Sequence, residues 1–298
     1  MTLSVAMLQS CFTGIESTPK ITAGDVRREK ITSRPEESYL SDILPQPLDS
    51  WQPGKRFYVA DNKFSILFGK SSPEAQNLQG QTLLFHHADE VTSITGDKVV
   101  QLSFTTPAGR IITYDTGQSR ASIDRAMQVE VPFTVDMDLV DSVATRIKGQ
   151  QYYVITPSWY DTALQSRTGR KFVPVTVTDV LPGTAFYPIL LKLLDENGQP
   201  FCLLMSVGHD MKAPRKFASL FSLSDPRLRY PTITDANWRN IILGRVAEDM
   251  TRDECRLALG SPATVDRRPG YSIMSEIWTY ENGIYLIFED GILRSFRQ

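Results

Sequence analysis

The chain has few residues of the types that carry out nucleophilic or metal chemistry. Its 298 residues include three cysteines and three histidines. Cys11, Cys202 and Cys255 have neither the spacing of metal ligands nor the pattern of a disulfide framework. Cys202 lies in a predicted strand and Cys255 on the apolar face of a predicted helix, where a thiol serves as a small apolar side chain. We therefore expect no catalytic residue, no metal site and no cofactor.

The histidines give two places where side chains might converge on a ligand. His86 and His87 are neighbours in a predicted strand, so strict alternation puts one ring on each face and predicts that they cannot share a ligand. His209 and Asp210 follow the end of another predicted strand, close to Ser206. We interpret that trio as a local turn. An envelope hydrolase with a site near His209 remains the alternative.

Three acidic residues form the best acidic cluster, at Asp136, Asp138 and Asp141. A calcium loop is the functional interpretation of such spacing. The segment has no glycine at the bend and no glutamate at the terminal ligand position of an EF-hand loop. The pattern therefore favours a solvated acidic surface.

Composition excludes two large classes of function. With 41% hydrophobic and 22% charged residues, the chain is typical of a globular protein with ordinary cores. A formal net charge of −2 does not favour nucleic-acid binding, which calls for a basic stripe or patch. No apolar run is long enough to span a bilayer as a helix.

The N-terminal segment suggests a lipid anchor. A short apolar run, Leu3–Leu8, leads into Leu8-Gln9-Ser10-Cys11, which resembles a bacterial lipobox and predicts lipid attachment at Cys11. No lysine or arginine precedes the run, as a signal peptide would require, and a start further upstream would explain this. Residues 1–50 are predicted to be a signal remnant followed by a flexible tether. The alternative is a first strand or helix with an incidental cysteine.

Short β-rich runs begin at Trp51 and predict a small antiparallel barrel over residues 51–120. The same layout returns over residues 148–210, where Tyr152-Tyr153-Val154 echoes Phe57-Tyr58-Val59 and Gly169 echoes Gly80. Residues 122–148 between them fit either a helix or an extended linker. The predicted strands of the first unit are Phe57–Ala60, Phe64–Phe68, Thr82–His87, Val99–Phe104 and Arg110–Tyr114.

Three aromatic residues beside prolines or in predicted loops are the best candidates for a binding surface. Trp51 precedes Pro53-Gly54, and Trp159 and Tyr160 follow Pro157. Tryptophan and tyrosine are favoured at binding hot spots, so these rings would offer flat faces to a glycan or a peptide. The alternative is that they close the ends of the barrels.

The C-terminal region carries the most strongly specified helix. Thr251 and Glu254 have the spacing of a capping box, and Gly260 with Pro262 ends the helix. A second helix is predicted between Thr234 and Gly244. Three strands follow, joined by Asn-Gly and Asp-Gly turns of the hairpin type. They are predicted at Glu276–Tyr280, Ile284–Phe288 and Ile292–Phe296.

These motifs resemble those of the SmpA/OmlA, or BamE-like, family of small outer-membrane lipoproteins. The matching motifs are Met250-Thr251, Leu259-Gly260-Ser261-Pro262, Trp278-Thr279-Tyr280 and Phe288-Glu289-Asp290-Gly291. The sequence departs from the family pattern at Asp249, where a glycine usually stands. The resemblance implies a two-layer binding module without catalytic residues, a layout that also occurs in periplasmic proteins that inhibit enzymes. By layout alone, the two central units resemble bacterial Src-homology-three barrels.

Together these features predict a mainly β protein with a C-terminal α+β module. Two tandem small antiparallel β-barrels would be followed by a BamE-like unit of two helices and three strands, over residues 225–298. We expect a non-catalytic outer-membrane lipoprotein on the periplasmic side, anchored at Cys11 and docking to an envelope protein or to peptidoglycan. A soluble, cytoplasmic interaction protein without an anchor is a further alternative.

Overall fold

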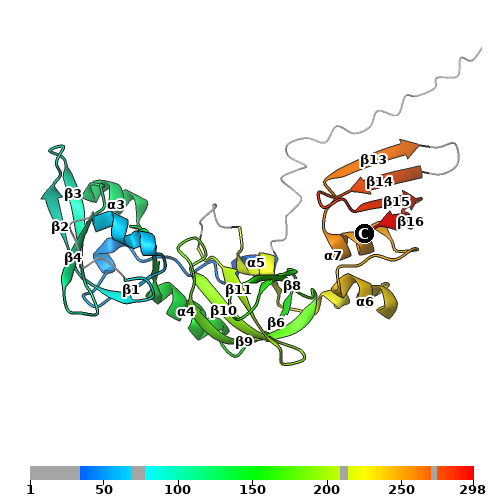
Figure 1. Ribbon diagram of the computed structural model, residues 1–298, viewed down its shortest axis with the longest axis horizontal. Coiled ribbons are helices and arrows are strands. Elements are labelled where there is room, and N and C mark those ends of the chain that lie inside the picture. The colour runs from blue at the N-terminus through cyan, green and yellow to red at the C-terminus, as the bar shows by residue number, and fades with distance from the viewer. Residues whose placement is uncertain (1–33, 69–77, 209–213, 270–273) are drawn as a thin grey trace, which may run out of the picture. The chain divides into compact units, whose positions relative to one another are not determined.

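The computed structural model describes residues 34–68, 78–208, 214–269 and 274–298. Within these ranges the protein is mainly β, as predicted, and its strands form three antiparallel sheets (Figure 1). We call them sheet A, sheet B and sheet C in chain order. Each sheet has a hydrophobic core of its own.

Sheet A has five strands in the order β4-β3-β2-β1-β5. Apolar side chains alternate along β1 and the first part of β2, so one face is buried and the other is solvated. The Thr106–Gly109 turn between β3 and β4 is the predicted hairpin, and Gly109 has the positive φ that such a turn requires. The strands are β1 (Arg56–Val59), β2 (Thr82–Thr92), β3 (Lys98–Thr105), β4 (Ile111–Asp115) and β5 (Thr134–Asp136).

Sheet B has seven strands in the order β12-β6-β9-β10-β11-β7-β8. Its core is rich in valine and leucine, and β11 is buried over five consecutive residues. The strands are β6 (Gln151–Val154), β7 (Ser158–Tyr160), β8 (Ser166–Thr168), β9 (Val173–Pro182), β10 (Ile189–Asp195), β11 (Pro200–Met205) and β12 (Phe221–Ser222).

The two sheets repeat one strand order. The neighbours β4-β3-β2-β1-β5 correspond in sequence order to β11-β10-β9-β6-β12, and the hairpin β7–β8 is an addition to the second copy. The first strands, β1 and β6, even share their pattern of burial. In both sheets the outermost strands do not pair with each other, so neither forms the closed barrel that the sequence suggested.

One predicted strand of sheet A is a helix. Residues Phe64–Phe68 belong to the 3₁₀-helix η2 (Asn62–Phe68). Phe64 is buried and Leu67 packs beside it, whereas Ile66 is exposed. This three-residue repeat fits a 3₁₀-helix and not the two-residue repeat of a strand.

The segment between the two sheets is neither a single helix nor an extended linker. It contains α3 (Arg120–Ala126), strand β5 and α4 (Met137–Ile147). Val140, Val143 and Ile147 of α4 join the core of sheet B. The remaining short helices before sheet C are α2 (Pro35–Ser38), η1 (Leu48–Ser50), α5 (Phe217–Leu220) and η4 (Pro226–Arg229).

Residues 34–50 are packed against the cores and do not form a flexible tether. Leu40 and Ile43 join the core of sheet B, and Leu48 joins that of sheet A. The expectation of a tether is therefore wrong for this stretch, because a few apolar side chains suffice to hold a polar segment on a core. The earlier part of the predicted tether lies outside the described residues.

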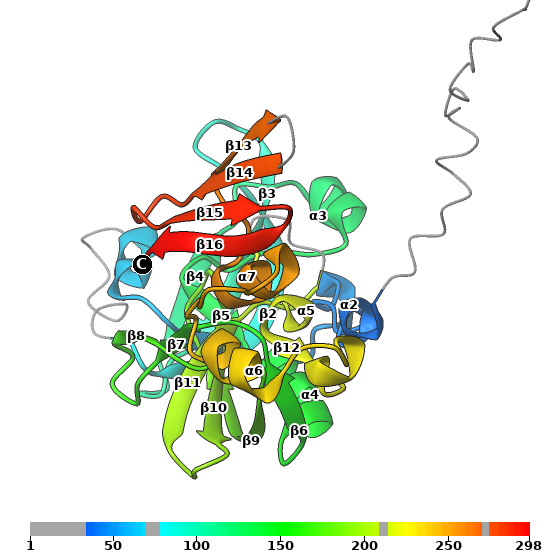
Figure 2. The ribbon, with the colours of Figure 1, turned by 90° about the vertical axis from the view of Figure 1, so that its right-hand side faces the viewer.

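Sheet C has four strands where three were predicted. Its order is β13-β14-β15-β16, and α6 and α7 pack on one face (Figure 1); Figure 2 shows α7 beside β16. The additional strand, β13, is an edge strand rich in charged residues, which obscured it in the sequence. The elements are α6 (Asp235–Ile242), α7 (Arg252–Leu259), β13 (Thr264–Pro269), β14 (Met274–Thr279), β15 (Tyr285–Glu289) and β16 (Ile292–Arg297).

The caps of both helices form as predicted. Thr251 and Glu254 make the complete capping box of α7, and Thr234 caps α6. Asp249, which stands where the family pattern has glycine, adopts a positive φ of 66°. Its carboxylate accepts a hydrogen bond from Arg294 at 2.6 Å. Aspartate is among the few residues besides glycine that tolerate this conformation, so the turn keeps its shape.

Candidate functional site

The two tryptophans predicted to form a binding surface are core residues. Trp51 is 7% exposed and Trp159 is 2% exposed. Trp51 packs against Phe57 and donates its indole N–H to Gln46 O at 3.1 Å. Trp159 stacks on Phe201 with ring centroids 3.8 Å apart. The prediction that their rings face solvent is wrong, because Trp51 lies in the core of sheet A and Trp159 in the core of sheet B.

Tyr160 is partly exposed to solvent. It is half-buried, and the Arg215 guanidinium lies 5.8 Å from the ring centroid. A single partly covered tyrosine does not make the flat platform on which sugar rings stack. Trp51 and Trp159 therefore offer no exposed ring to a glycan.

The acidic cluster anchors strand β1 to the start of α4. Lys55 is buried and donates to Asp136 at 2.9 Å and also to Asp138. Arg56 pairs with Asp141. Burial raises the pKa of Asp136, although the hydrogen bond from Lys55 opposes that rise. The cluster is thus an ion-pair network in which Asp136 is largely buried, whereas Asp138 is partly exposed and Asp141 is exposed, so the expected solvated surface holds for Asp141 and not for Asp136.

Among the described residues, the second buried lysine, Lys171, has carbonyl groups and not a carboxylate as its hydrogen-bond partners. Lys171 donates to the carbonyl oxygens of Leu257 and Ala258 at the end of α7. Burial lowers the pKa of its ammonium group to about 8. A cation at this position satisfies two carbonyl groups that a helix leaves unpaired at its C-terminus.

The described cysteines are buried and poorly suited to nucleophilic chemistry. Burial raises the pKa of Cys202, and it raises that of Cys255 to about 12. Neither thiol therefore ionises readily, and the thiolate is the reactive form. Ser206 is buried beside Arg215 O. Cys11, the predicted lipid attachment site, and the pair His209-Asp210 lie outside the described residues.

The structure brings His86 and His87 together, contrary to the prediction. The register of β2 against β3 shifts between Phe85 and His87, which marks a β-bulge. The extra residue places both imidazoles on the solvated face, with their Nδ1 atoms in contact. His87 Nε2 also lies 2.9 Å from Asp89 Oδ2. A bulge leaves no clear signal in the sequence, so strict alternation gave the wrong faces.

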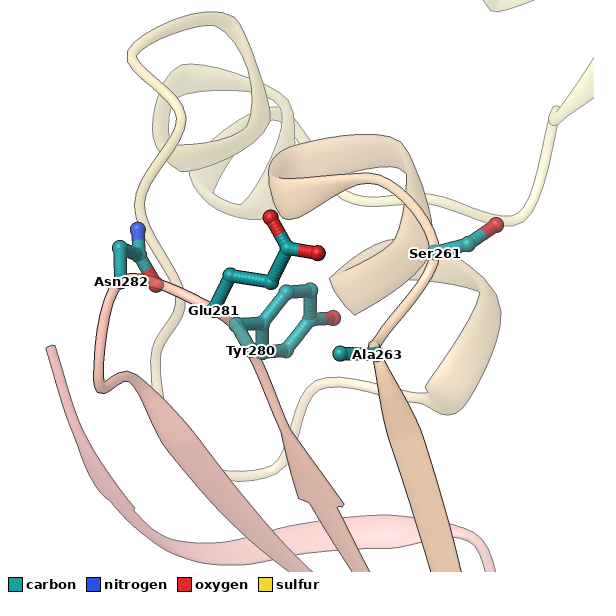
Figure 3. Close-up of a pocket in the computed structure, with 5 residues that line it drawn as sticks. All are labelled: Ser261, Ala263, Tyr280, Glu281 and Asn282. Atoms are coloured by element: carbon teal, nitrogen blue, oxygen red, sulfur yellow. The ribbon is translucent and has the colours of Figure 1, made fainter.

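An open hollow of about 440 Å³ lies at the end of α7 (Figure 3). Ser261, Ala263, Tyr280, Glu281 and Asn282 line it, and two of these, Ser261 and Tyr280, belong to the motifs of the family resemblance. The Tyr280 hydroxyl donates to Gly260 O at 3.2 Å. Burial raises the pKa of Tyr280 to about 12, so the phenol stays protonated near neutral pH. It ties the helix end to β14 and is not poised for acid–base chemistry.

The face of sheet C opposite the helices is the broadest candidate surface in that part of the chain. Trp278, Leu286 and Phe288 point into the core, so Ile277 and Ile287 between them point outward. These two isoleucines are cross-strand partners at the centre of the face. Polar and charged side chains occupy the neighbouring outward positions. They are Asp266, Arg268, Ser275, Thr279, Tyr285, Glu289, Ser295 and Arg297.

A further hollow of about 570 Å³ lies at the end of the β2–β3 hairpin. Small polar side chains and Lys98 line it. Among the described residues, no three or more His, Cys, Asp or Glu side chains are grouped so that they could hold a metal ion. The described helices are also too short or too polar to cross a membrane.

Comparison of the chain with protein-family models, with curated proteins and with solved structures finds no match. The local geometry described above therefore carries the functional argument.

Proposed function

We propose that this protein is a non-catalytic binding protein of the cell envelope. A lipid on Cys11 would hold it to the outer membrane on the periplasmic side, and sheet C would dock a partner protein. The observation that carries the docking proposal is the face of sheet C opposite α6 and α7, with the partly exposed Ile277 and Ile287 at its centre and charged residues around them.

The composition of this face favours a protein over peptidoglycan as the partner. An apolar centre with a polar, charged rim is the usual anatomy of a protein–protein interface. Both signs of charge are present, for example Arg297 and Glu289. Glycan recognition would call for exposed aromatic platforms, and Trp51 and Trp159 are buried.

Two features support the family resemblances behind this proposal. Two capped helices followed by a twisted antiparallel sheet are what a BamE-like module would contain, with β13 as an addition at the edge. In sheets A and B the last strand returns to pair with the first, which is the strand order of Src-homology-three barrels. Both resemblances concern layout and suggest a modular scaffold.

The anchor is tested in the native host, with the gene expressed together with its upstream region. Mass spectrometry of membrane fractions should find an acylated peptide that begins at Cys11. A soluble protein that starts with an unprocessed Met1 would refute the anchor and support the cytoplasmic alternative.

The docking face is tested separately by placing a photo-crosslinking amino acid at Ile277 in the same host. We expect one discrete adduct with a protein, which Ile287→Arg abolishes. The matched control is Ile111→Arg, a charge added to an exposed isoleucine on sheet A, which should leave the adduct unchanged. Adduct formation that is insensitive to Ile287→Arg would exclude this face as the docking site.

A further inference from the structure

The β-bulge in β2 creates a two-histidine cluster on the open face of sheet A. Without the bulge His87 would point into the core, whereas in the structure Ala88 takes the inward place opposite Leu102. His86 and His87 therefore stand side by side, with ring centroids 4.7 Å apart and planes at 75°. Bulges are conserved devices for redirecting a side chain, often next to functional sites.

The hydrogen bonds of His87 determine which of its nitrogens is free to bind. Nε2 faces Asp89 Oδ2 at 2.9 Å, and an aspartate can only accept at neutral pH, so Nε2 carries the proton. The Nδ1 atom of His87 is then an unprotonated acceptor, and it faces Nδ1 of His86. Nδ1 of His86 therefore carries a proton and donates its N–H to Nδ1 of His87.

We propose that His86 and His87 bind a divalent transition-metal ion through their two Nδ1 atoms. The ion replaces the hydrogen bond between the two rings, and the His86 proton moves from Nδ1 to Nε2, so that both imidazoles bind as neutral ligands. Imidazole suits copper, nickel and zinc, and Cu²⁺ binds most tightly in the usual order of affinities. Asp89 holds the far nitrogen of His87, as carboxylates do behind metal-binding histidines.

The geometry requires only a small opening of the pair. A metal–nitrogen distance of about 2.0 Å sets the two nitrogens roughly 3 Å apart. The His87 side chain is 45% exposed, so its ring can turn by this amount without disturbing the core. Ser103, opposite His87 on β3, lies within 3.4 Å of Nε2 and supports the same orientation.

Water would complete the coordination of this ion. No third His, Cys, Asp or Glu among the described residues is placed to join the two imidazoles as a ligand. We therefore expect an exchangeable site with open positions, at which a further ligand can bind, and not a closed structural site.

The test is a titration of the full-length, untagged protein with Cu²⁺, followed by electron paramagnetic resonance. We expect one equivalent bound with nitrogen hyperfine coupling from two imidazoles. His86→Gln or His87→Gln should weaken binding at least tenfold, and Asp89→Asn by about tenfold, the low end for a residue behind a ligand. His209→Gln is the matched control because the chain has only three histidines, and it should bind as the unchanged protein does.

A second measurement guards against copper binding elsewhere. Titration with Zn²⁺, monitored by the imidazole ¹⁵N resonances, should shift the signals of His86 and His87 and leave that of His209 in place. The proposal is overturned if no stoichiometric binding occurs. It is equally overturned if the double variant His86→Gln/His87→Gln binds copper as well as the unchanged protein.

Discussion

Sheets A and B share a strand order but differ in what lies beside the strand that ends this order, β4 in sheet A and β11 in sheet B. In sheet B the hairpin β7–β8 pairs along β11, whose side chains are buried on both faces. In sheet A the corresponding strand, β4, lies at the edge, with one fully buried side chain, that of Ile112. Among the described residues, β4 pairs with no further strand beyond β3, and η2 contacts it. One plan of chain connections tolerates both solutions because edge strands need only local protection.

The two closing strands are also held by different polar groups. Strand β5 is tied by Lys55 to Asp136, whereas β12 is tied by Glu36, which accepts from Ser222 at 3.1 Å and from the amide of Leu223 at 3.0 Å. Glu36 is buried, and its Oε2 has no hydrogen-bond partner within the part of the chain that the structure describes. The two sheets therefore share a strand order but differ in the polar contacts that hold the closing strand.

The largest effect should come from breaking the polar anchor of sheet A. Lys55→Met leaves Asp136 buried without its cation, which should cost about 3–5 kcal/mol in the free energy of unfolding. Lys171→Met, next to sheet B, is the comparison variant. It leaves two carbonyl groups unpaired but no carboxylate, so the free energy of unfolding should fall by about 1–3 kcal/mol. Urea unfolding measures both. Equal losses would mean that the carboxylates do not set the cost.

The echoed glycines should differ in the next largest effect. A Cβ on Gly169 would lie 1.9 Å from Cδ2 of Trp159, whereas a Cβ on Gly80 meets no atom within 4 Å. Gly169→Ala must displace a stacked, buried indole and should cost about 3 kcal/mol, at the upper end for overpacking.

Gly80→Ala is the matched control for that substitution. Gly80 has φ of +80°, so alanine there meets only backbone strain, worth roughly 1–2 kcal/mol. Urea unfolding followed by tryptophan fluorescence compares the two variants. A Gly80→Ala variant that is at least as unstable as Gly169→Ala would contradict the distinction between the copies.

The two anchoring carboxylates should respond to acid with opposite signs. Burial raises the pKa of Glu36, but hydrogen bonds from Leu223 and Ser222 and the charge of Arg229 outweigh it, so the net pKa is lowered from 4.5. Its stabilisation is present above that value and is lost as the pH falls. Burial raises the pKa of Asp136 above 3.8, so its folded form takes up a proton before the unfolded form and gains stability as the pH falls.

Stability measured between about pH 3 and pH 6 separates the two groups. Glu36→Gln should make the loss of stability towards acid shallower, and Asp136→Asn should make it steeper. The same direction of change in both variants would show that at least one of the two anchors is assigned wrongly.

The smallest effect concerns the exposed edges. Ile111 lies at the open edge of sheet A, and Arg167 lies on the short edge strand β8 of sheet B. Ile111→Lys should change stability by less than about 0.5 kcal/mol and reduce concentration-dependent association. Arg167→Ile should increase association. Sedimentation velocity over a range of concentrations tests both, and unchanged association in both variants would argue against open edges as sites of contact.

Much of the fold of sheet C could be predicted because its signals are local. The capping box at Thr251 and the Asn-Gly and Asp-Gly turns each specify the chain within a few residues. Strand β13 was not predicted because its sequence is rich in charged residues. It is a strand because it pairs with β14, and that pairing cannot be read from its own residues. The candidate docking face was likewise invisible, since it depends on which side of the sheet the helices cover.

The central part shows the same limit. The echo of Phe57–Val59 in Tyr152–Val154 predicted a repeated layout, but it did not predict the strand order or the open sheets. The structure alone shows that Trp51 and Trp159 are buried and that His86 and His87 share a face. The residues around a position do not show which distant strand pairs with it. That pairing determines which side chains are buried and where a β-bulge forms.

By itself, then, the sequence determined the β-rich class, the turns and the helix caps, because these follow from energies within a few residues of each position. The tertiary structure decided which aromatic rings fill the cores, which charges are paired and which histidines meet. Those outcomes depend on side chains brought together from distant strands. The acids at Asp136 and Asp138 illustrate both parts: their spacing was visible in the sequence, but the lysine that pairs with them lies just before β1, far away along the chain.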